Sequence, residues 1–184
     1  MSIALNELIS TRWSPRQYID RPVEPEKLHA LFEAARWAAS CFNEQPWRFV
    51  YVTQADPEAF QKMLGLLIEK NQQWAKPAYV LGFSAGKKTF TVNGAPNRWS
   101  LHDTGGASAS LAIEANALRL HTHFMGGFDS QRARAEFHVP DDFELGAAFA
   151  VGYIDEVATR PGPRTRKPLD EIVFQGDWGV PARL

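Results

Sequence analysis

The chain has 184 residues, 45% of them hydrophobic, with 20 Lys and Arg against 21 Asp and Glu and a formal net charge of −1. This length is enough for one domain with a substantial core and leaves little room for a second. The balanced charge argues against a nucleic-acid partner held by phosphate neutralisation, and the single cysteine, Cys41, excludes an internal disulfide and a cysteine-rich zinc site.

The N-terminal sequence carries no secretory signal. It lacks a basic region followed by an apolar stretch and a small-residue cleavage site. No apolar run approaches the roughly 18–20 residues that a membrane helix needs. We therefore expect one domain over residues 1–184, located in the cytoplasm, with no membrane partner and no metal site.

Helix and strand patterns alternate through the first half of the chain. Apolar spacing predicts a short amphipathic helix over Ile3–Ser10, a helix over Glu26–Trp37 and another helix from Pro57. The β-branched and aromatic run Arg48–Thr53 predicts a strand. A polar, turn-rich segment at residues 38–47 separates this strand from the second helix.

The second half contains the longest predicted helix, Asp103–Leu120, which is rich in small residues. Small residues allow close approach by another helix or by a ligand. The other elements expected are a strand at Tyr79–Ser84, a loop at Lys87–Ser100, a strand and turn at His123–Gly127, a helix from about Ser130, and strands at Leu145–Ile154 and Asp170–Phe174. This alternation is typical of an α/β or α+β domain.

The residues after Ile154 form a long extension, about 155–184. It includes a basic, proline-rich stretch from Thr159 to Pro168. An extension of this length often packs on another subunit, and a disordered end is the alternative.

The first candidate for chemistry is Arg12-Trp-Ser-Pro-Arg16, where two guanidinium groups and a hydroxyl lie within five residues. Arginine matches the paired oxygens of phosphate, and serine adds a hydroxyl donor. The segment therefore suits a phosphate monoester. The alternative is a pair of solvated arginines beside a turn.

The second candidate is Ser40-Cys-Phe-Asn43, which leads through Gln45 into a strand. Asn and Gln amides both donate and accept hydrogen bonds, as a heterocycle with mixed edges requires. A flavin pyrimidine ring is such a heterocycle. The alternative is an Asx-type turn in which Pro46 fixes the entry to the strand.

Two further candidates lie late in the chain. Gly126-Gly127 would let a backbone N–H come close to a ligand, and near a flavin it would stabilise negative charge in the reduced ring. Arg164-Thr-Arg-Lys-Pro168 could complete a phosphate clamp from the far end of the chain. The alternatives are an ordinary turn and a solvated basic loop.

Taken in order, these segments resemble the nitroreductase family of flavoenzymes. The resemblance spans nearly the whole chain, and the ordered set is more specific than any one motif. Its motifs stand here as Arg12, Ser14 and Arg16; Asn43, Gln45, Pro46 and Trp47; Asn71, Trp74 and Ala75; Asp103, Thr104 and Gly105; Gly126, Gly127 and Phe128; and Arg166 to Val173.

The resemblance implies an α+β, nitroreductase-like three-layer fold, with a central mixed sheet surrounded by helices, and a homodimer with FMN at the subunit interface. Arg12, Ser14, Arg16 and Arg166 would hold the phosphate and ribityl end. The cofactor-binding residues it implies are Arg12, Trp13, Ser14, Arg16, Ser40, Cys41, Asn43, Gln45, Asn71, Gly126, Gly127 and Arg166.

The activity that the resemblance implies is hydride transfer from NADH or NADPH to flavin N5, and then to a small acceptor such as a nitroaromatic, quinone or enal. No side-chain acid or base is required, because the chemistry belongs to the cofactor. The alternatives are a flavin-dependent oxidase or dehydrogenase with another donor, a non-catalytic FMN-binding protein, and a helix-rich interaction module without a cofactor.

The chain departs from the family pattern in two respects, one in the Ala39-Ser40-Cys41 segment and one in its length, and His102 is a further single residue of interest. Ala39-Ser40-Cys41 replaces the common Pro-Ser-Ser, which would place Cys41 near the flavin or leave it as a small buried thiol. His102 is a candidate proton donor on the substrate side, with a structural role at the helix start as the alternative. The chain is also short for the family, and Lys87–Ser100 would be a reduced version of the excursion that covers the substrate face.

Overall fold

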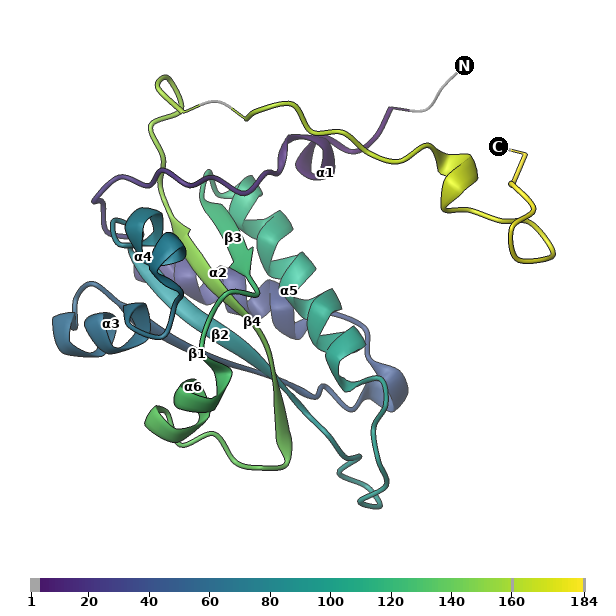
Figure 1. Ribbon diagram of the computed structural model, residues 1–184, viewed down its shortest axis with the longest axis horizontal. Helices are drawn as coiled ribbons and strands as arrows, with labels where there is room; N and C mark the ends of the chain where they lie inside the picture. Colours follow the sequence, from purple (N-terminus) through teal and green to yellow (C-terminus); the bar gives the residue numbers. More distant parts are fainter. Residues whose placement is uncertain (1–3, 160, 184) are drawn as a thin grey trace.

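The computed structural model describes residues 4–159 and 161–183. Figure 1 shows a central sheet with helices on both faces and a C-terminal extension that leaves this body. The elements in chain order are α1 (Glu7–Thr11), α2 (Pro25–Arg36), the 3-10 turn η1 (Cys41–Asn43), β1 (Trp47–Thr53), α3 (Pro57–Leu64), α4 (Glu69–Ala75), β2 (Val80–Lys87), α5 (Ser100–Ala117), β3 (His121–Met125), α6 (Ser130–Glu136), β4 (Phe143–Gly152) and the 3-10 turn η2 (Leu169–Glu171).

The sheet has four strands in the order β1-β2-β4-β3, and each neighbouring pair is antiparallel. The α+β class is confirmed, but within the described residues the expectation of a mixed sheet is wrong. The cause is the insertion of β4. The strands β2 and β3 run in the same direction and are joined through α5, yet β4 lies between them and pairs antiparallel with both.

Alternation along the strands divides the core into two layers. In β2, Leu81 and Phe83 face one cluster, which α3, α4 and α6 cover. Val80 of β2 and Val151 of β4 face the other cluster, which α2 and α5 cover. Because successive side chains of a strand point to opposite faces, both faces of a fully buried strand must be apolar. This explains the nearly continuous apolar run of β2.

Local signals define the helices that hold these layers. Pro57 occupies the first turn of α3, and the side chain of Asp56 accepts a hydrogen bond from the Ala59 N–H at 3.1 Å. In α2, Pro25 stands in the first turn and Arg36 in the last, as the helix dipole favours. The predicted helix before Pro25 is shorter than expected, since α1 begins at Glu7, and the expected start at Ile3 lies outside the described residues.

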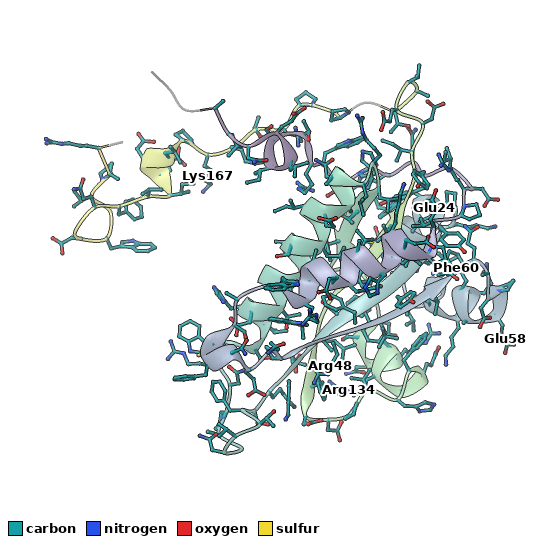
Figure 2. All side chains as sticks on the ribbon, turned by 180° about the vertical axis from the view of Figure 1, so that it is seen from behind. Glu24, Arg48, Glu58, Phe60, Arg134 and Lys167 are labelled. Atoms are coloured by element: carbon teal, nitrogen blue, oxygen red, sulfur yellow. The ribbon has the colours of Figure 1, made fainter. Side chains whose placement is uncertain are left out.

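Two elements differ from the sequence prediction. The helix α4 was not predicted, although it contains Asn71 and Trp74. The strand predicted at Asp170–Phe174 is wrong: the segment forms η2, and Phe174 makes only an isolated bridge to Pro181. A strand needs a partner, and the extension runs clear of the sheet in the view that labels Lys167 (Figure 2). None of the helices in the described part of the chain is long and apolar enough to cross a membrane.

Candidate functional site

The segment after α1 and the C-terminal extension together form a pocket rich in arginine. We call it the arginine pocket, and its volume is about 520 Å³. Its lining consists of Arg12, Trp13, Ser14, Arg16, His123, Gly162, Pro163 and Arg164. Arg164 donates to the backbone carbonyls of Ser10 and Arg12, and so fastens the extension to the start of the chain. Arg12 donates to the Ser14 hydroxyl at 3.3 Å.

The arginine pocket concentrates positive charge. Burial lowers the pKa of Arg12, and the nearby guanidinium groups of Arg164 and Arg166 lower it further. Among the described residues, no carboxylate lies within 4.0 Å of the guanidinium nitrogens of Arg12, Arg16, Arg164 or Arg166. Clustered cations without carboxylate partners favour a bound anion, and a dianionic phosphate is the anion that matches arginine geometry best.

His123 connects this pocket to the Gly-Gly turn. Its Nδ1 lies 2.8 Å from the Pro15 carbonyl oxygen, so Nδ1 carries the proton and donates. Its ring centroid lies 4.3 Å from that of Trp74, which follows Asn71 by one turn of α4. The Asn71 side-chain amide donates to the carbonyl of Gly127 at 3.1 Å. The Arg12–Arg16, Asn71–Ala75 and Gly126–Phe128 motifs therefore lie along one edge of the sheet, beside β3.

An apolar groove of about 540 Å³ starts at Arg12 and follows α5. Its lining consists of Ile9, Arg12, Ser84, Leu101, Thr104, Gly105, Ser108, Ala109, Ala112, Ile113, Phe124, Gly146 and Ala147. Gly105, Ser108, Ala109 and Ala112, four of the small residues predicted to permit close approach, thus line open space, whereas Ala107 packs in the core. Met125 pairs with Ala148, so Gly126 follows at the end of β3 beside the part of β4 that lines the groove. The groove therefore has a cationic end at Arg12 and passes beside the end of β3, which leads into the glycine turn.

The loop that carries the other predicted residues is strained. Phe42, Asn43 and Gln45 all have positive φ, at 53°, 55° and 51°. Residues other than glycine rarely adopt this conformation, and strain of this kind clusters at functional sites. The loop is held from within, because the Ser40 hydroxyl accepts from the Gln45 backbone N–H at 3.0 Å.

Asp103 anchors this loop to α5. Its buried carboxylate accepts from the Cys41 backbone N–H at 2.9 Å, and its other oxygen lies 3.1 Å from Nδ1 of His102. The Cys41 side chain is half-buried, and the His102 ring is exposed. Asp103 therefore ties the start of the loop to α5 through a hydrogen bond. The side chain of His102 lies beside Asp103 and is exposed to solvent.

Two groups of the predicted cofactor-binding residues lie at opposite ends of α5. One is the Arg12–Arg16 segment at the arginine pocket and the second is the Ser40–Gln45 loop; Asn71 and the Gly-Gly turn lie at the end of β3. Asp103 holds the loop, and Asn116, near the other end of α5, donates to the Leu8 carbonyl and the Thr11 hydroxyl. At 1.5 Å per residue these anchors are about 20 Å apart along the helix. One chain does not bring the two groups together.

Three residues that line or support the site were not among the twelve predicted cofactor-binding residues, although Arg164 opens the basic run expected to complete a phosphate clamp and Trp74 belongs to a predicted motif. Arg164 contacts the Arg12 segment directly, whereas Arg166 donates to its own neighbour Thr165 and acts on Arg12 only through charge. His123 and Trp74 are the other two. The alternation of β3 offered a signal for His123, since His121 and His123 must share one face of the strand.

The two histidines on that face predict a pH effect on stability. Burial lowers the pKa of His121 and of His123, and Arg16 and Arg12 lower that of His123 further. In the unfolded chain both histidines take up protons as the pH falls through the ordinary histidine pKa of about 6.5. In the folded chain their lowered pKa values keep them neutral to a lower pH, so the unfolded state binds more protons. We therefore expect the free energy of unfolding to fall as the pH drops from about 7.5 to about 5.5. In urea titrations of the cofactor-free protein, His123→Phe should show a smaller loss; equal losses would contradict this assignment.

Within residues 4–159 and 161–183, no three His, Cys, Asp or Glu side chains are grouped as a metal ion would require.

The comparisons with known proteins point to one family. The model described as "Nitroreductase family" matches residues 9–153. A solved structure of an oxidoreductase containing FMN is 34% identical, covers 98% of this chain and 96% of that chain, and superposes with a TM-score of 0.89.

Two curated relatives are also similar to this chain, and one of them carries a nitroreductase name. A protein of Xanthomonas oryzae pv. oryzae named "Putative NADH dehydrogenase/NAD(P)H nitroreductase" is 28% identical over 176 residues, which covers 86% of this chain and 89% of that protein. An uncharacterised 15.4 kDa protein of Mycolicibacterium smegmatis is 38% identical over 92 residues. That match covers 46% of this chain and 62% of the relative.

Proposed function

The chain belongs to the nitroreductase family, and we propose that it is an FMN-dependent oxidoreductase that takes electrons from NADH or NADPH. The observation that carries the proposal is the arginine pocket, where Arg12, Ser14, Arg16 and Arg164 converge without a carboxylate partner among the described residues. An FMN-containing structural relative at 34% identity supports the choice of cofactor. The name of the Xanthomonas relative supports the nicotinamide donor.

The residues present fit FMN at both of its ends. The arginine pocket matches the charge and geometry of a phosphate monoester. The groove that starts at Arg12 is apolar and walled by small residues, as a planar aromatic ring requires. At the far end a Cβ on Gly127 would lie 2.9 Å from the Asn71 amide, whereas a Cβ on Gly126 would meet nothing within 4 Å. Gly126 therefore leaves open space beside the groove.

Bound FMN would supply the hydride chemistry, accepting from the nicotinamide and passing the hydride to a small electrophile such as a nitroaromatic, quinone or enal. The protein's part is to bind and to orient. Arg12, Arg16 and Arg164 would hold the phosphate, with the Ser14 hydroxyl as a further donor. Asn71, oriented by its bond to Gly127, would present its free amide oxygen and second N–H to a polar ring edge.

We further propose that the site is completed by a second copy of the chain. The Ser40–Gln45 loop and the arginine pocket lie about 20 Å apart along α5. In a two-fold dimer with antiparallel α5 helices, the loop of each chain would approach the arginine pocket of its partner. The extension fits this arrangement, since residues 161–183 are almost entirely exposed and Trp178 is 92% exposed. The single-domain boundary at 1–184 and the cytoplasmic location stay predictions.

Mixed dimers test the shared site. We would co-express an Arg12→Ala chain with an Asn43→Ala, Gln45→Ala chain, each carrying a different affinity tag, and purify the mixed species. A shared site predicts that each mixed dimer keeps one intact site, while the other combines both defects. FMN binding at half the wild-type stoichiometry with wild-type affinity is the expected result. Two equally weakened sites would show instead that each chain binds FMN alone.

The colour of the purified protein separates the alternatives. An FMN protein should be yellow, and the cofactor released on denaturation should carry one phosphate. A colourless protein that takes up no added FMN would leave an interaction module without a cofactor as the remaining possibility. A yellow protein that accepts electrons from neither nicotinamide would favour a carrier, or an oxidase or dehydrogenase with another donor.

A further inference from the structure

A hydrogen-bonded histidine–aspartate pair lies at the start of α5, at the end of the apolar groove away from Arg12. Asp103 is buried, and one of its carboxylate oxygens accepts from the Cys41 backbone N–H at 2.9 Å. Its other oxygen lies 3.1 Å from Nδ1 of His102. Because an ionised carboxylate only accepts, Nδ1 carries the proton and Nε2 is the ring nitrogen left for another partner. A carboxylate in this position fixes the tautomer and the orientation of an imidazole.

The helical repeat places His102 on the groove side of α5. Gly105 and Ala109 line the groove, and they follow His102 by three and seven residues. Residues at this spacing share one face of a helix. Leu101, the preceding residue, lines the end of the groove itself. The His102 side chain is 77% exposed, so the imidazole lies at the mouth of the groove and is accessible to a ligand there.

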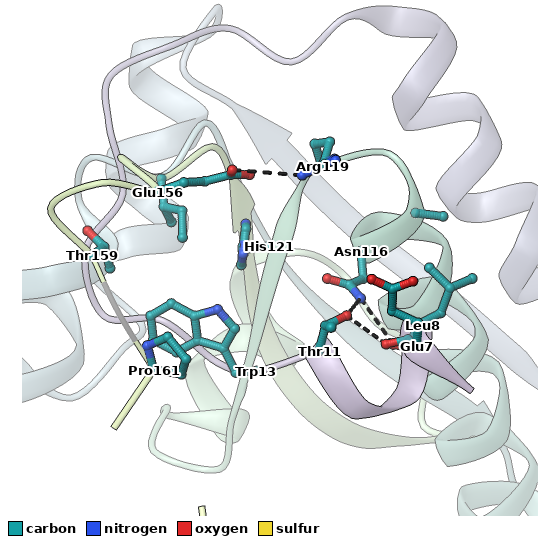
Figure 3. Close-up of a pocket in the computed structure, with 12 residues that line it drawn as sticks. Glu7, Leu8, Thr11, Trp13, Asn116, Arg119, His121, Glu156, Thr159 and Pro161 are labelled. Atoms are coloured by element: carbon teal, nitrogen blue, oxygen red, sulfur yellow. Dashed lines mark hydrogen bonds and ion pairs between the residues drawn. The ribbon is translucent and has the colours of Figure 1, made fainter. Parts of the chain in front are cut away.

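The described walls of the groove offer no other proton donor. Each of its hydroxyl groups already donates to a backbone carbonyl of this chain; they belong to Ser84, Thr104 and Ser108. Arg12 is the one ionisable side chain in the lining, and a guanidinium does not give up its proton. The carboxylates of Glu7 and Glu156 line a separate cavity at the other end of α5, which Figure 3 shows. His102 is therefore the donor nearest to hand at the groove.

Reduction of a conjugated carbonyl compound needs a proton as well as a hydride. When a hydride adds to the β-carbon of an enal, the electron pair of the C=C bond moves toward the carbonyl group and leaves an enolate. The enolate must then gain a proton at its α-carbon. A quinone that has accepted a hydride likewise gains a proton on its second oxygen. A side chain placed to give this proton speeds such a step by about 10²–10⁴-fold.

We propose that His102 is the proton donor for conjugated carbonyl acceptors such as enals and quinones, and that Asp103 is its positioning residue. Nε2 of the protonated imidazole would give its proton to the α-carbon of an enal, or to the second oxygen of a quinone. The neutral imidazole would then regain a proton from water. The Asp103 carboxylate would stabilise the imidazolium between turnovers. The inference deepens the proposed function and rests on a flavin ring in the groove.

Benzoate binding to the oxidised, FMN-loaded protein tests the site without turnover. Benzoate joins a planar ring to a negative charge, and it stays ionised from about pH 5.5 to about pH 7.5, the range in which histidine ordinarily titrates. The wild type should lose about tenfold in benzoate affinity as the pH rises across this range, since a charged hydrogen bond is lost. His102→Gln should bind benzoate weakly throughout. The same pH dependence in both proteins, or none in the wild type, would overturn the proposal.

Other ionisable groups near His102 belong to three segments. They are Asp103 on α5, Arg98 in the loop before it, and Cys41 and Glu44 in the Ser40–Gln45 loop. Ordinary pKa values for these four residue types lie outside about 5.5–7.5. Hydrogen bonds from Thr91 lower the pKa of Glu44 further. A pH dependence that disappears in His102→Gln is therefore assigned to His102.

Reoxidation of the dithionite-reduced, FMN-loaded protein tests the proton transfer. His102→Gln should slow reoxidation by cinnamaldehyde or benzoquinone about 100-fold, and added imidazole should restore part of the rate. Reoxidation by ferricyanide should be unchanged, because ferricyanide takes single electrons and no proton. His29→Gln, an exposed histidine on α2 outside the groove lining, is the control. Wild-type rates with both carbonyl acceptors in His102→Gln would overturn the proposal.

The two levels of the account fail in different ways. Dithionite replaces the nicotinamide, so a protein that accepts electrons from neither NADH nor NADPH would contradict the proposed function while both His102 tests still give an answer. A reduced wild type that ferricyanide reoxidises, but neither cinnamaldehyde nor benzoquinone does, would overturn the role of His102 alone. A protein that takes up no FMN would remove both.

Discussion

The Arg12→Ala variant is expected to bind FMN roughly 10- to 150-fold more weakly than the wild type. Arg12 lies at the junction of the arginine pocket and the apolar groove, so its guanidinium would contact the phosphate end from the side of the ring. A hydrogen bond to a charged group is worth about 1.5–3 kcal/mol, which corresponds to this range of dissociation constants. Titration of the cofactor-free variant with FMN, followed by flavin fluorescence, measures the loss.

The folded state of this variant should be unaffected. Arg164 bonds to the backbone carbonyl of Arg12, which alanine retains, and removal of Arg12 relieves its repulsion by Arg164 and Arg166. We therefore expect the cofactor-free variant to unfold at a temperature no lower than the wild type. Arg36→Ala is the matched control, because Arg36 pairs with Glu33 on the exposed side of α2. Wild-type FMN affinity in Arg12→Ala would contradict the phosphate assignment.

Gly82→Ala should give the largest loss of stability. Gly82 lies at the middle of β2, between β1 and β4. A Cβ there would lie 2.4 Å from the Val50 carbonyl oxygen and 2.5 Å from the Phe149 ring. The Val50 oxygen belongs to the neighbouring strand and cannot move without disturbing the sheet. Overpacking typically costs about 1–3 kcal/mol, and this site should reach the upper end.

Thermal unfolding of the cofactor-free protein measures this effect. At about 2–4 °C per kcal/mol for a chain of this size, the midpoint should fall by roughly 6–12 °C. Gly106→Ala on α5 is the matched control, since a Cβ at Gly106 meets nothing within 4 Å and alanine favours a helix. A Gly82→Ala midpoint equal to that of Gly106→Ala would show that the sheet adjusts to the added methyl group.

The parts of the fold that were predictable are those whose signals are local. The small-residue helix was expected at Asp103–Leu120 and occurs as α5, Ser100–Ala117, because a long run rich in alanine and free of proline favours a helix over several turns. The strand at Asp170–Phe174 was predicted from residue type alone and does not form within the chain. Residue type indicates which segments can be strands; the partner strand is a non-local property.

The candidate site shows the same limit. Arg12, Ser14 and Arg16 could be chosen because they lie close in sequence, and the structure places them in one pocket. The Arg164–Pro168 run was also expected at a phosphate clamp, but the residue chosen from it was Arg166, whereas it is Arg164 that bonds to the carbonyls of Ser10 and Arg12 across some 150 residues. The positive φ of Phe42 was equally hidden, because phenylalanine disfavours that conformation and only the surrounding contacts impose it.

The measurement that tests the central claim most directly is anaerobic mixing of the FMN-loaded protein with NADH and with NADPH, followed by the absorbance of the bound flavin. We predict that at least one nicotinamide bleaches the flavin fully, and that a nitroaromatic, quinone or enal added afterwards restores the yellow colour. A flavin that stays oxidised in excess NADH and excess NADPH would contradict the account of this protein as a nicotinamide-dependent reductase.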